Sequence, residues 1–200
     1  MRVLALAALL VCGCPKDDDP CQLGFIGDRS AAPELEVIVL DPDGTVRAIA
    51  DGAGAPLIEP PQGGRVIFAG VRARNVDACA ATLTGALRDS TSNHVMVDTR
   101  TINLVAQSGG TGGSTPDEAS TFANVPVCPN QWSQRDVFGQ DYTLEITLID
   151  RQQRRVTKNL RVQPMCAEPG GKLTECLCIC KKGYVLGEPC TPDGGVDAGP

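Results

Sequence analysis

Apolar and polar residues alternate in several short segments between residues 34 and 164, as they do in half-buried β-strands. In the first segment, 34–40, Leu35, Val37 and Val39 alternate with their neighbours, and the residues of a turn follow at 41–44. The Gly-, Ser- and Thr-rich segment 108–116 is expected to form a flexible loop. Further strands are predicted at 45–49, 65–74, 79–87, 94–97, 101–106 and 120–127.

The clearest pattern is a hairpin at the end of this region. Apolar residues alternate with polar ones from Tyr142 to Leu148, and after a turn at 150–154 the alternation resumes from Val156 to Val162. Two such strands cannot bury their apolar faces alone, so a partner sheet is required. We therefore predict an all-β fold in which residues 34–164 form a two-sheet β-sandwich.

The first hairpin strand also resembles the penultimate strand of immunoglobulin-like domains in bacterial surface proteins. The resemblance implies an immunoglobulin-like β-sandwich in which the Tyr142 hydroxyl makes a tyrosine-corner hydrogen bond. Trp132 departs from the pattern, because it follows both Cys79 and Cys128 instead of lying between them. The likeness is architectural and implies no activity. The matching residues are Gly139, Asp141, Tyr142, Leu144, Ile146 and Asp150.

The first residues have the composition of an export signal. Arg2 precedes an apolar run, 3–11, that is too short to span a bilayer of about 30 Å, so residues 1–13 are interpreted as a cleaved signal peptide. Val11, Cys12 and Gly13 before Cys14 resemble the lipobox of bacterial lipoproteins. That resemblance implies cleavage before Cys14, a lipid on its sulfur and usually an acylated amine, palmitate being a typical chain. The alternative is a secretory signal removed by the general peptidase.

Residues 14–33 follow as the lipidated cysteine and an acidic linker. The run from Lys16 to Asp19 repels itself and stays extended, which suits a solvated spacer. It also resembles the short export signal of surface-exposed lipoproteins in some Gram-negative bacteria. We expect a protein of the cell envelope that is anchored by lipid in the outer membrane, and the second resemblance implies display on the cell surface.

Eight cysteines remain after the signal peptide and Cys14. An even, dense set in an exported chain indicates disulfides formed in an oxidising compartment, although eight cysteines allow 105 pairings. Cys79 lies on the apolar side of a predicted strand and Cys128 ends another, so we predict that these two pair across the sandwich. The eight are Cys21, Cys79, Cys128, Cys166, Cys176, Cys178, Cys180 and Cys190.

Residues 165–190 form a separate cysteine-rich knob in this interpretation. Cys178 and Cys180, followed by Gly183, Tyr184 and Cys190, resemble the second half of an epidermal-growth-factor-like module, which implies a Cys180–Cys190 bridge. Cys166 and Cys176 do not supply the usual first half. When four tail cysteines pair locally, the fifth is expected to reach Cys21. The last segment, 191–200, is rich in Pro, Gly and Asp and is expected to be disordered.

Charge and motifs exclude several function classes. The formal net charge is −6 and basic residues are scattered, which disfavours nucleic-acid binding. His94 is the single histidine, and Ser90, Ser92 and Asp98 nearby form no G-x-S-x-G elbow, so we predict no catalytic residues. The tail thiols are a conceivable metal site, but oxidation competes outside the cytosol, so we expect no metal and no cofactor.

The sequence therefore predicts a non-enzymatic structural or interaction module on a lipid anchor, with a protein or polysaccharide partner in the envelope. The alternative is a module that binds carbohydrate or another small ligand, in which Trp132 is the only candidate for an exposed aromatic platform. An unrecognised hydrolase ranks third.

Overall fold

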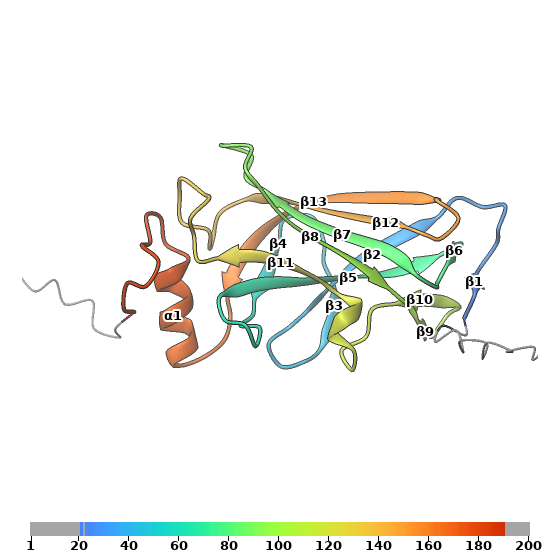
Figure 1. Cartoon of the computed structure of the whole chain (residues 1–200), viewed down its shortest axis with the longest axis horizontal. Coiled ribbons are helices and arrows are strands. Elements are labelled where there is room, and N and C mark those ends of the chain that lie inside the picture. Colours follow the sequence, from blue (N-terminus) through green and yellow to red (C-terminus); the bar gives the residue numbers. More distant parts are fainter. Residues whose placement is uncertain (1–20, 22, 191–200) are drawn as a thin grey trace, which may run out of the picture.

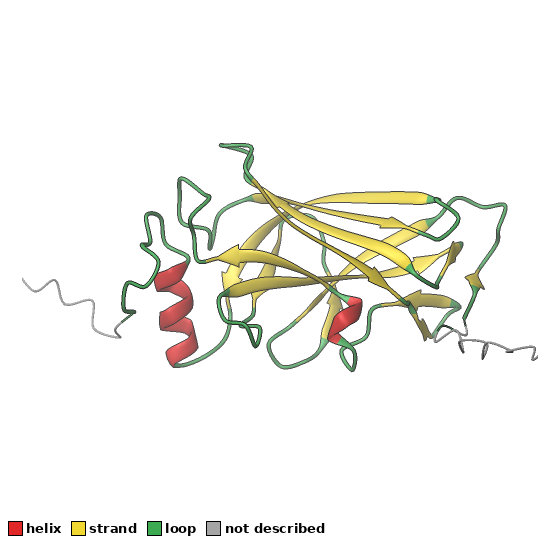
Figure 2. Ribbon diagram, in the orientation of Figure 1, coloured by secondary structure: helices red, strands yellow, loops and turns green. Residues whose placement is uncertain are grey.

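The computed structural model describes residue 21 and residues 23–190. The predicted signal peptide, Cys14, the charged run and the tail 191–200 lie outside the described residues. Strands dominate the fold, and one α-helix lies at one end of the long axis (Figures 1 and 2). The all-β prediction is confirmed. The elements are β1 (Phe25–Ile26), β2 (Glu34–Leu40), β3 (Val46–Ala48), β4 (Ala53–Leu57), β5 (Arg65–Arg74), β6 (Val76–Asp77), β7 (Ala81–Arg88), β8 (Val95–Ile102), β9 (Val105–Gln107), β10 (Thr111–Gly113), η1 (Ala119–Thr121), β11 (Ala123–Cys128), β12 (Tyr142–Ile149), β13 (Arg155–Cys166) and α1 (Gly171–Ile179).

Two larger sheets pack face to face. One has six strands in the order β3-β2-β5-β10-β9, with β11 paired to the first half of β5; the other has five in the order β4-β13-β12-β7-β8. β1 and β6 form a separate short ladder. Apolar residues of both larger sheets meet in one core. The alternation predicted for β2 and β12 is confirmed, since Leu35, Val37 and Val39 and the four apolar residues of β12 from Tyr142 to Leu148 are all buried.

The predicted flexible loop at 108–116 is wrong in part. Thr111–Gly113 is β10, which pairs with β9 on one side and with β5 on the other. A Cβ on Gly112 would lie 2.4 Å from the Ile26 Cδ1 atom, and one on Gly113 would lie 2.7 Å from the Val71 carbonyl oxygen. The glycines therefore allow a close approach of chains, which composition alone cannot distinguish from flexibility.

Among the elements that the sequence did not predict, β4 and α1 matter most for the arrangement of the chain. β4 contains Gly54 and Pro56, which disfavour strands, yet it runs parallel to β13 at the edge of its sheet, where proline is tolerated. α1 occupies the region expected to be an epidermal-growth-factor-like knob. Cys176, Ile179 and Cys180 of this helix region are buried in the same core as the sandwich, so the extension has no separate core.

Candidate functional site

The end of the molecule that carries α1 contains most of the sequence-predicted site residues. All eight cysteines from Cys21 onward form disulfides, but the predicted pairings are wrong. Cys79 pairs with Cys21 and not with Cys128, and the Cys180–Cys190 bridge implied by the resemblance is absent from the described residues. The remaining bridges are Cys128–Cys180, Cys166–Cys176 and Cys178–Cys190.

The helical geometry of α1 explains this correction. Cys176 and Cys180 are four residues apart, so they lie on the same side of the helix and face the sandwich, where they are 1% and 0% exposed. Cys178 lies between them in sequence and points elsewhere, toward Cys190. The C-x-C-x-C spacing places Cys176 and Cys180 four residues apart, which is the spacing of residues on one side of a helix. The resemblance to a cysteine-rich knob without a helix led to the other pairing.

The loop after β11 binds the C-terminal end of α1. The backbone N–H of Asn130 donates to the Ile179 carbonyl at 2.8 Å, and that of Val137 donates to the Cys180 carbonyl at 3.0 Å. The Asn130 side-chain amide donates to the carbonyls of Arg135 and Lys181 at 2.9 and 3.2 Å. Carbonyls at a helix end lack partners within the helix, so this loop supplies them and fixes the helix on the sandwich.

A buried arginine joins the sandwich to the start of α1. Arg65, the first residue of β5, has a fully buried side chain. Its Nη2 lies 3.1 Å from Glu175 Oε2 and donates to the Lys172 carbonyl, and its Nε lies 3.8 Å from Glu168. Lys172 pairs with Glu168 at 3.0 Å and with Glu59 at 3.3 Å, and hydrogen bonds to both carboxylates raise the pKa of its amine. The positive and negative charges of this group largely compensate one another. We therefore interpret the group, called the Arg65 network below, as one that holds α1 on the sandwich.

Trp132 does not provide the exposed platform expected of a sugar site. Its side chain is only 9% exposed, and its indole N–H donates to the Val127 carbonyl at 2.8 Å. The ring packs against Tyr142 with centroids 5.5 Å apart. The aromatic platform predicted from the sequence is therefore incorrect, because the ring serves the core of the sandwich.

His94 lies just before β8 and bonds to this tryptophan's backbone. Its Nδ1 is 2.6 Å from the Trp132 carbonyl oxygen, so this nitrogen carries the proton and donates. The Ser92 hydroxyl donates to Asp89 at 2.9 Å instead of to the imidazole, and Asp98 pairs with Arg100 at 2.6 Å. The structure thus does not bring the candidate serine, histidine and aspartate into a catalytic relay.

A buried carboxylate, Asp89, organises the loops beside Trp132. It accepts hydrogen bonds from the Thr91 N–H and the Ser92 hydroxyl, and pairs with Arg135 at 3.1 Å. Burial alone raises the pKa of Asp89, but these hydrogen bonds and the Arg135 charge outweigh burial, so the pKa lies below its ordinary value. The network has no direct signal in the sequence, because Asp89 and its ion-pair partner Arg135 are 46 residues apart.

Tyr142 belongs to the same network. Its hydroxyl bonds to the Ser133 hydroxyl at 2.8 Å, so the predicted tyrosine corner, which requires a backbone partner, is replaced by a side-chain contact. Burial raises the pKa of the Tyr142 hydroxyl. The Arg135 guanidinium lies 4.6 Å from the centre of its ring. Tyr142 thus contacts Trp132, Ser133 and Arg135, and we interpret it as a structural residue.

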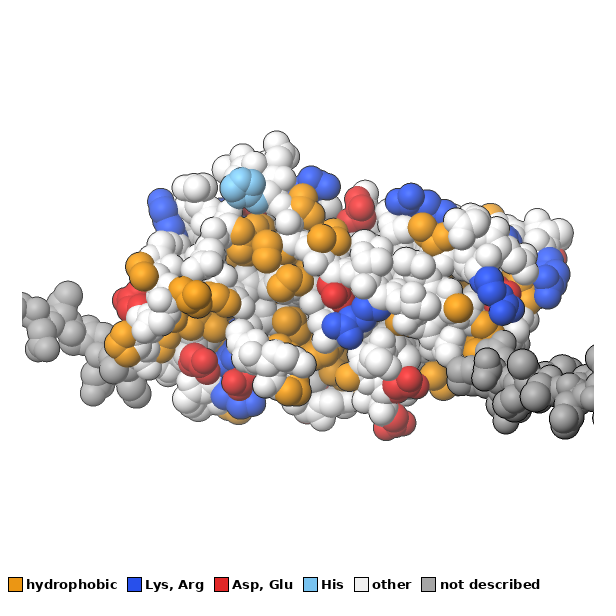
Figure 3. Space-filling view, viewed as in Figure 1, with side chains coloured by type: hydrophobic (Ala, Val, Ile, Leu, Met, Phe, Trp, Pro, Cys, Tyr) orange, Lys and Arg blue, Asp and Glu red, His pale blue; other side chains and the backbone are white. Residues whose placement is uncertain are grey.

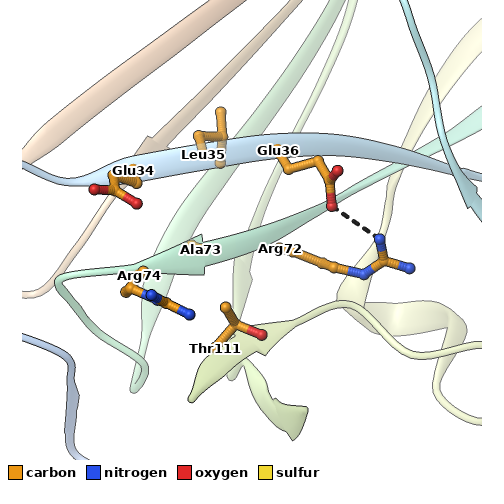
Figure 4. A pocket seen from close by; sticks show the side chains of 7 residues that line it. All are labelled: Glu34, Leu35, Glu36, Arg72, Ala73, Arg74 and Thr111. Atoms are coloured by element: carbon orange, nitrogen blue, oxygen red, sulfur yellow. Dashed lines mark hydrogen bonds and ion pairs between the residues drawn. The ribbon is translucent and has the colours of Figure 1, made fainter. Parts of the chain in front are cut away.

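Surface depressions in the described residues are open. The one in Figure 4 has a volume of 360 Å³ and lies over β2, β5 and β10. Glu36 pairs there with Arg72 at 2.8 Å and Arg74 donates to the Gly109 carbonyl, so three of its four charged side chains, all except that of Glu34, are already engaged. A depression of 260 Å³ lies near the histidine, on a face where Figure 3 shows hydrophobic side chains gathered. It is lined by Met96, Pro126, Val127, Cys128, Pro129, Gln131 and Trp132.

One group of described residues has metal-ligating atoms close together. The sulfurs of Cys166, Cys176 and Cys180 lie within 4.8 Å of one another. Each is bonded to another sulfur, so none is a thiolate able to coordinate a metal. The cluster is therefore described as two neighbouring disulfides.

Searches against protein-family models, curated proteins and solved structures found no significant match. Among the described residues, no helix has the length and apolar character needed to cross a membrane.

Proposed function

We propose that this chain is an exported, lipid-anchored envelope lipoprotein whose sandwich and extension form a non-enzymatic interaction module. The observation that carries the proposal is the engagement of all eight cysteines from Cys21 to Cys190 in disulfides. Such a set is stable in an oxidising compartment and is rarely kept in a reducing cytosol. The lipobox-like sequence at Val11–Cys14 then supplies the route of export and the anchor. The immunoglobulin-like relationship suggested by the β12 sequence is part of this proposal.

The arrangement of the elements supports a role in presenting one end of the molecule. β1, the first described strand, and α1 lie at opposite ends of the long axis (Figure 1). A lipid at Cys14 would therefore hold the β1 end nearer the membrane and present the α1 end outward. Of the seven large apolar side chains that are exposed among the described residues, four lie on the extension, at Leu173, Leu177, Val185 and Leu186.

Lipid labelling tests the anchor. We expect the full chain, produced in a Gram-negative host with an alkyne-tagged fatty acid, to carry the label and to sediment with membranes. Cys14→Ala should abolish the label and leave the protein either as uncut precursor or soluble, because it removes the only sulfur in the lipobox position. Cys12→Ala is the matched control and should retain both the label and the sedimentation with membranes, since alanine is also small. Unlabelled wild-type protein, or equal labelling of Cys14→Ala, would reject the anchor.

Site-specific cross-linking tests the interaction role. A photoreactive residue at Leu177 should yield adducts with an envelope component in intact cells, and one at Thr99, exposed on β8, should not. Equal yields at the two positions would reject the assignment of the α1 end as the interacting surface.

A further inference from the structure

Two disulfides meet at the junction between the sandwich and α1. Cys128 is the last residue of β11 and Cys166 the last of β13, and each is bonded to a cysteine of the helix region. The Cys176 and Cys180 sulfurs, which belong to different bridges, are 3.9 Å apart. The Cys166 sulfur completes a group of three within 4.8 Å. A thiolate released at any of these positions thus lies beside a second disulfide.

Access from solvent differs among the four cysteines. Cys166 is partly exposed, whereas Cys128, Cys176 and Cys180 are 6%, 1% and 0% exposed. Cys166 is therefore the one residue of the four that an external thiolate can approach. Attack at that sulfur makes Cys176 the leaving group, and thiol–disulfide exchange proceeds through such mixed disulfides.

We propose that this junction is a thiol-exchange site, opened at Cys166 by a small thiol, in which the two bridges exchange partners. The external thiolate bonds to Cys166 and releases the Cys176 thiolate. Cys176 then attacks Cys180 and displaces the Cys128 thiolate. Cys128 attacks the mixed disulfide at Cys166 and releases the external thiolate. Two disulfides are present before and after, so the thiol is regenerated and no net oxidant or reductant is consumed.

The exchanged pairing would connect the extension to the sandwich differently from the native pairing. Cys128–Cys166 would join the ends of two sandwich strands, and Cys176–Cys180 would lie within the helix. The Cα atoms of residues four apart in an α-helix are about 6 Å apart, within the range that a disulfide spans, but their Cβ atoms are about 5–6 Å apart, beyond the roughly 4 Å of a disulfide. The Cys176–Cys180 bridge therefore forms only when the last turn of α1, which ends at Ile179, opens. The extension would lose both disulfide links to the sandwich, leaving the Arg65 network and the Asn130 loop to hold α1. The exchange thus determines whether the extension is disulfide-linked to the sandwich.

The first test uses a variant with one free thiol. Cys166→Ser leaves Cys176 without its partner, and we expect it to displace Cys128 from Cys180 in a substantial share of molecules. Maleimide labelling after acid quenching should then place label on Cys128 as well as on Cys176. The matched control is Cys190→Ser, which frees Cys178. This thiol points away from the cluster, so its label should stay on Cys178.

The second test uses the wild-type chain and does not depend on a variant folding. Incubation with substoichiometric reduced glutathione at about pH 8, where thiolate is available, should produce the exchanged isomer. Trypsin then distinguishes the pairings. The native form links peptide 173–181 to both 101–135 and 162–172, whereas the exchanged form links 101–135 directly to 162–172. Either positive result supports the proposal. Label confined to Cys176 together with unchanged wild-type peptides overturns it.

Discussion

The Arg65 guanidinium and the Glu175 carboxylate meet at 3.1 Å although they are 110 residues apart in the sequence. The contact joins the first residue of β5 to α1, and the arginine side chain is fully buried there whereas that of Glu175 is 45% exposed. An ion pair of this kind depends on its buried member. Removing a buried partner costs far more than removing one that water can replace.

Arg65→Met tests this asymmetry. We expect it to lower the free energy of unfolding by about 3 kcal/mol, because the mostly buried Glu168 and two backbone carbonyls lose a donor. Glu175→Gln is the control and should cost less than about 1 kcal/mol. Urea unfolding with constant slope measures both. Equal losses in the two variants would contradict the buried position of Arg65.

Asp89→Asn should remove a pH-dependent part of the stability. The folded-state pKa of Asp89 lies below its unfolded value of about 3.9, so the carboxylate stabilises the fold fully above that value, and this contribution is lost as pH falls through the folded pKa. We expect the variant to be less stable by about 2 kcal/mol at neutral pH. The difference from wild type should shrink below about pH 4.

Urea unfolding across a pH series measures the Asp89 effect. The exposed Asp117→Asn is the control and should change stability by less than about 0.5 kcal/mol at neutral pH. The opposite result would be a stability difference between Asp89→Asn and wild type that grows as pH falls. That result would exclude the ion pair with Arg135 as the source of the pH-dependent stability.

Gly85 of β7 packs directly against the facing sheet. A Cβ there would lie 2.7 Å from Val125 Cγ2 and 3.0 Å from the Ala123 Cβ, both on β11 of the facing sheet. Gly85→Ala should therefore lower the unfolding free energy by about 1–3 kcal/mol through overpacking. Gly171→Ala, at the open start of α1, has nothing within 4 Å and should leave stability unchanged or raise it by up to about 1 kcal/mol. Thermal unfolding of both variants decides whether the two effects differ in sign.

Removing whole disulfides should rank their contributions by the loop that each closes. The Cys128–Cys180 bridge spans 52 residues and Cys178–Cys190 spans 12. On the chain-entropy model these contribute about 4 and about 3 kcal/mol. Replacing both members by alanine leaves no free thiol to exchange. Guanidinium unfolding of the two double variants should show the larger loss for Cys128→Ala/Cys180→Ala, and the reverse order would indicate that α1 is held mainly by other contacts.

Periodicity determined much of the sandwich. The strands at Glu34–Leu40 and Arg65–Arg74 have the predicted bounds, and the β12–β13 hairpin is present, because alternation records which side chains face a core. The even number of cysteines from Cys21 onward likewise predicted complete disulfide formation. Both signals are local or a matter of counting, so they can be read without knowing which segments meet.

Only the tertiary structure decided which partners meet. The observed cysteine pairings differ from the predicted ones because α1 turns Cys176 and Cys180 toward the ends of β13 and β11, and Cys128 at the end of β11 is 52 residues from Cys180 in the sequence. Trp132 became a core residue because Tyr142 and the Val127 carbonyl lie against it. A sequence states the chemistry of each side chain and the local period. How deeply a side chain is buried, which partner it has and at what distance are decided when two sheets and a helix pack together. That packing depends on contacts between segments that are distant in the sequence.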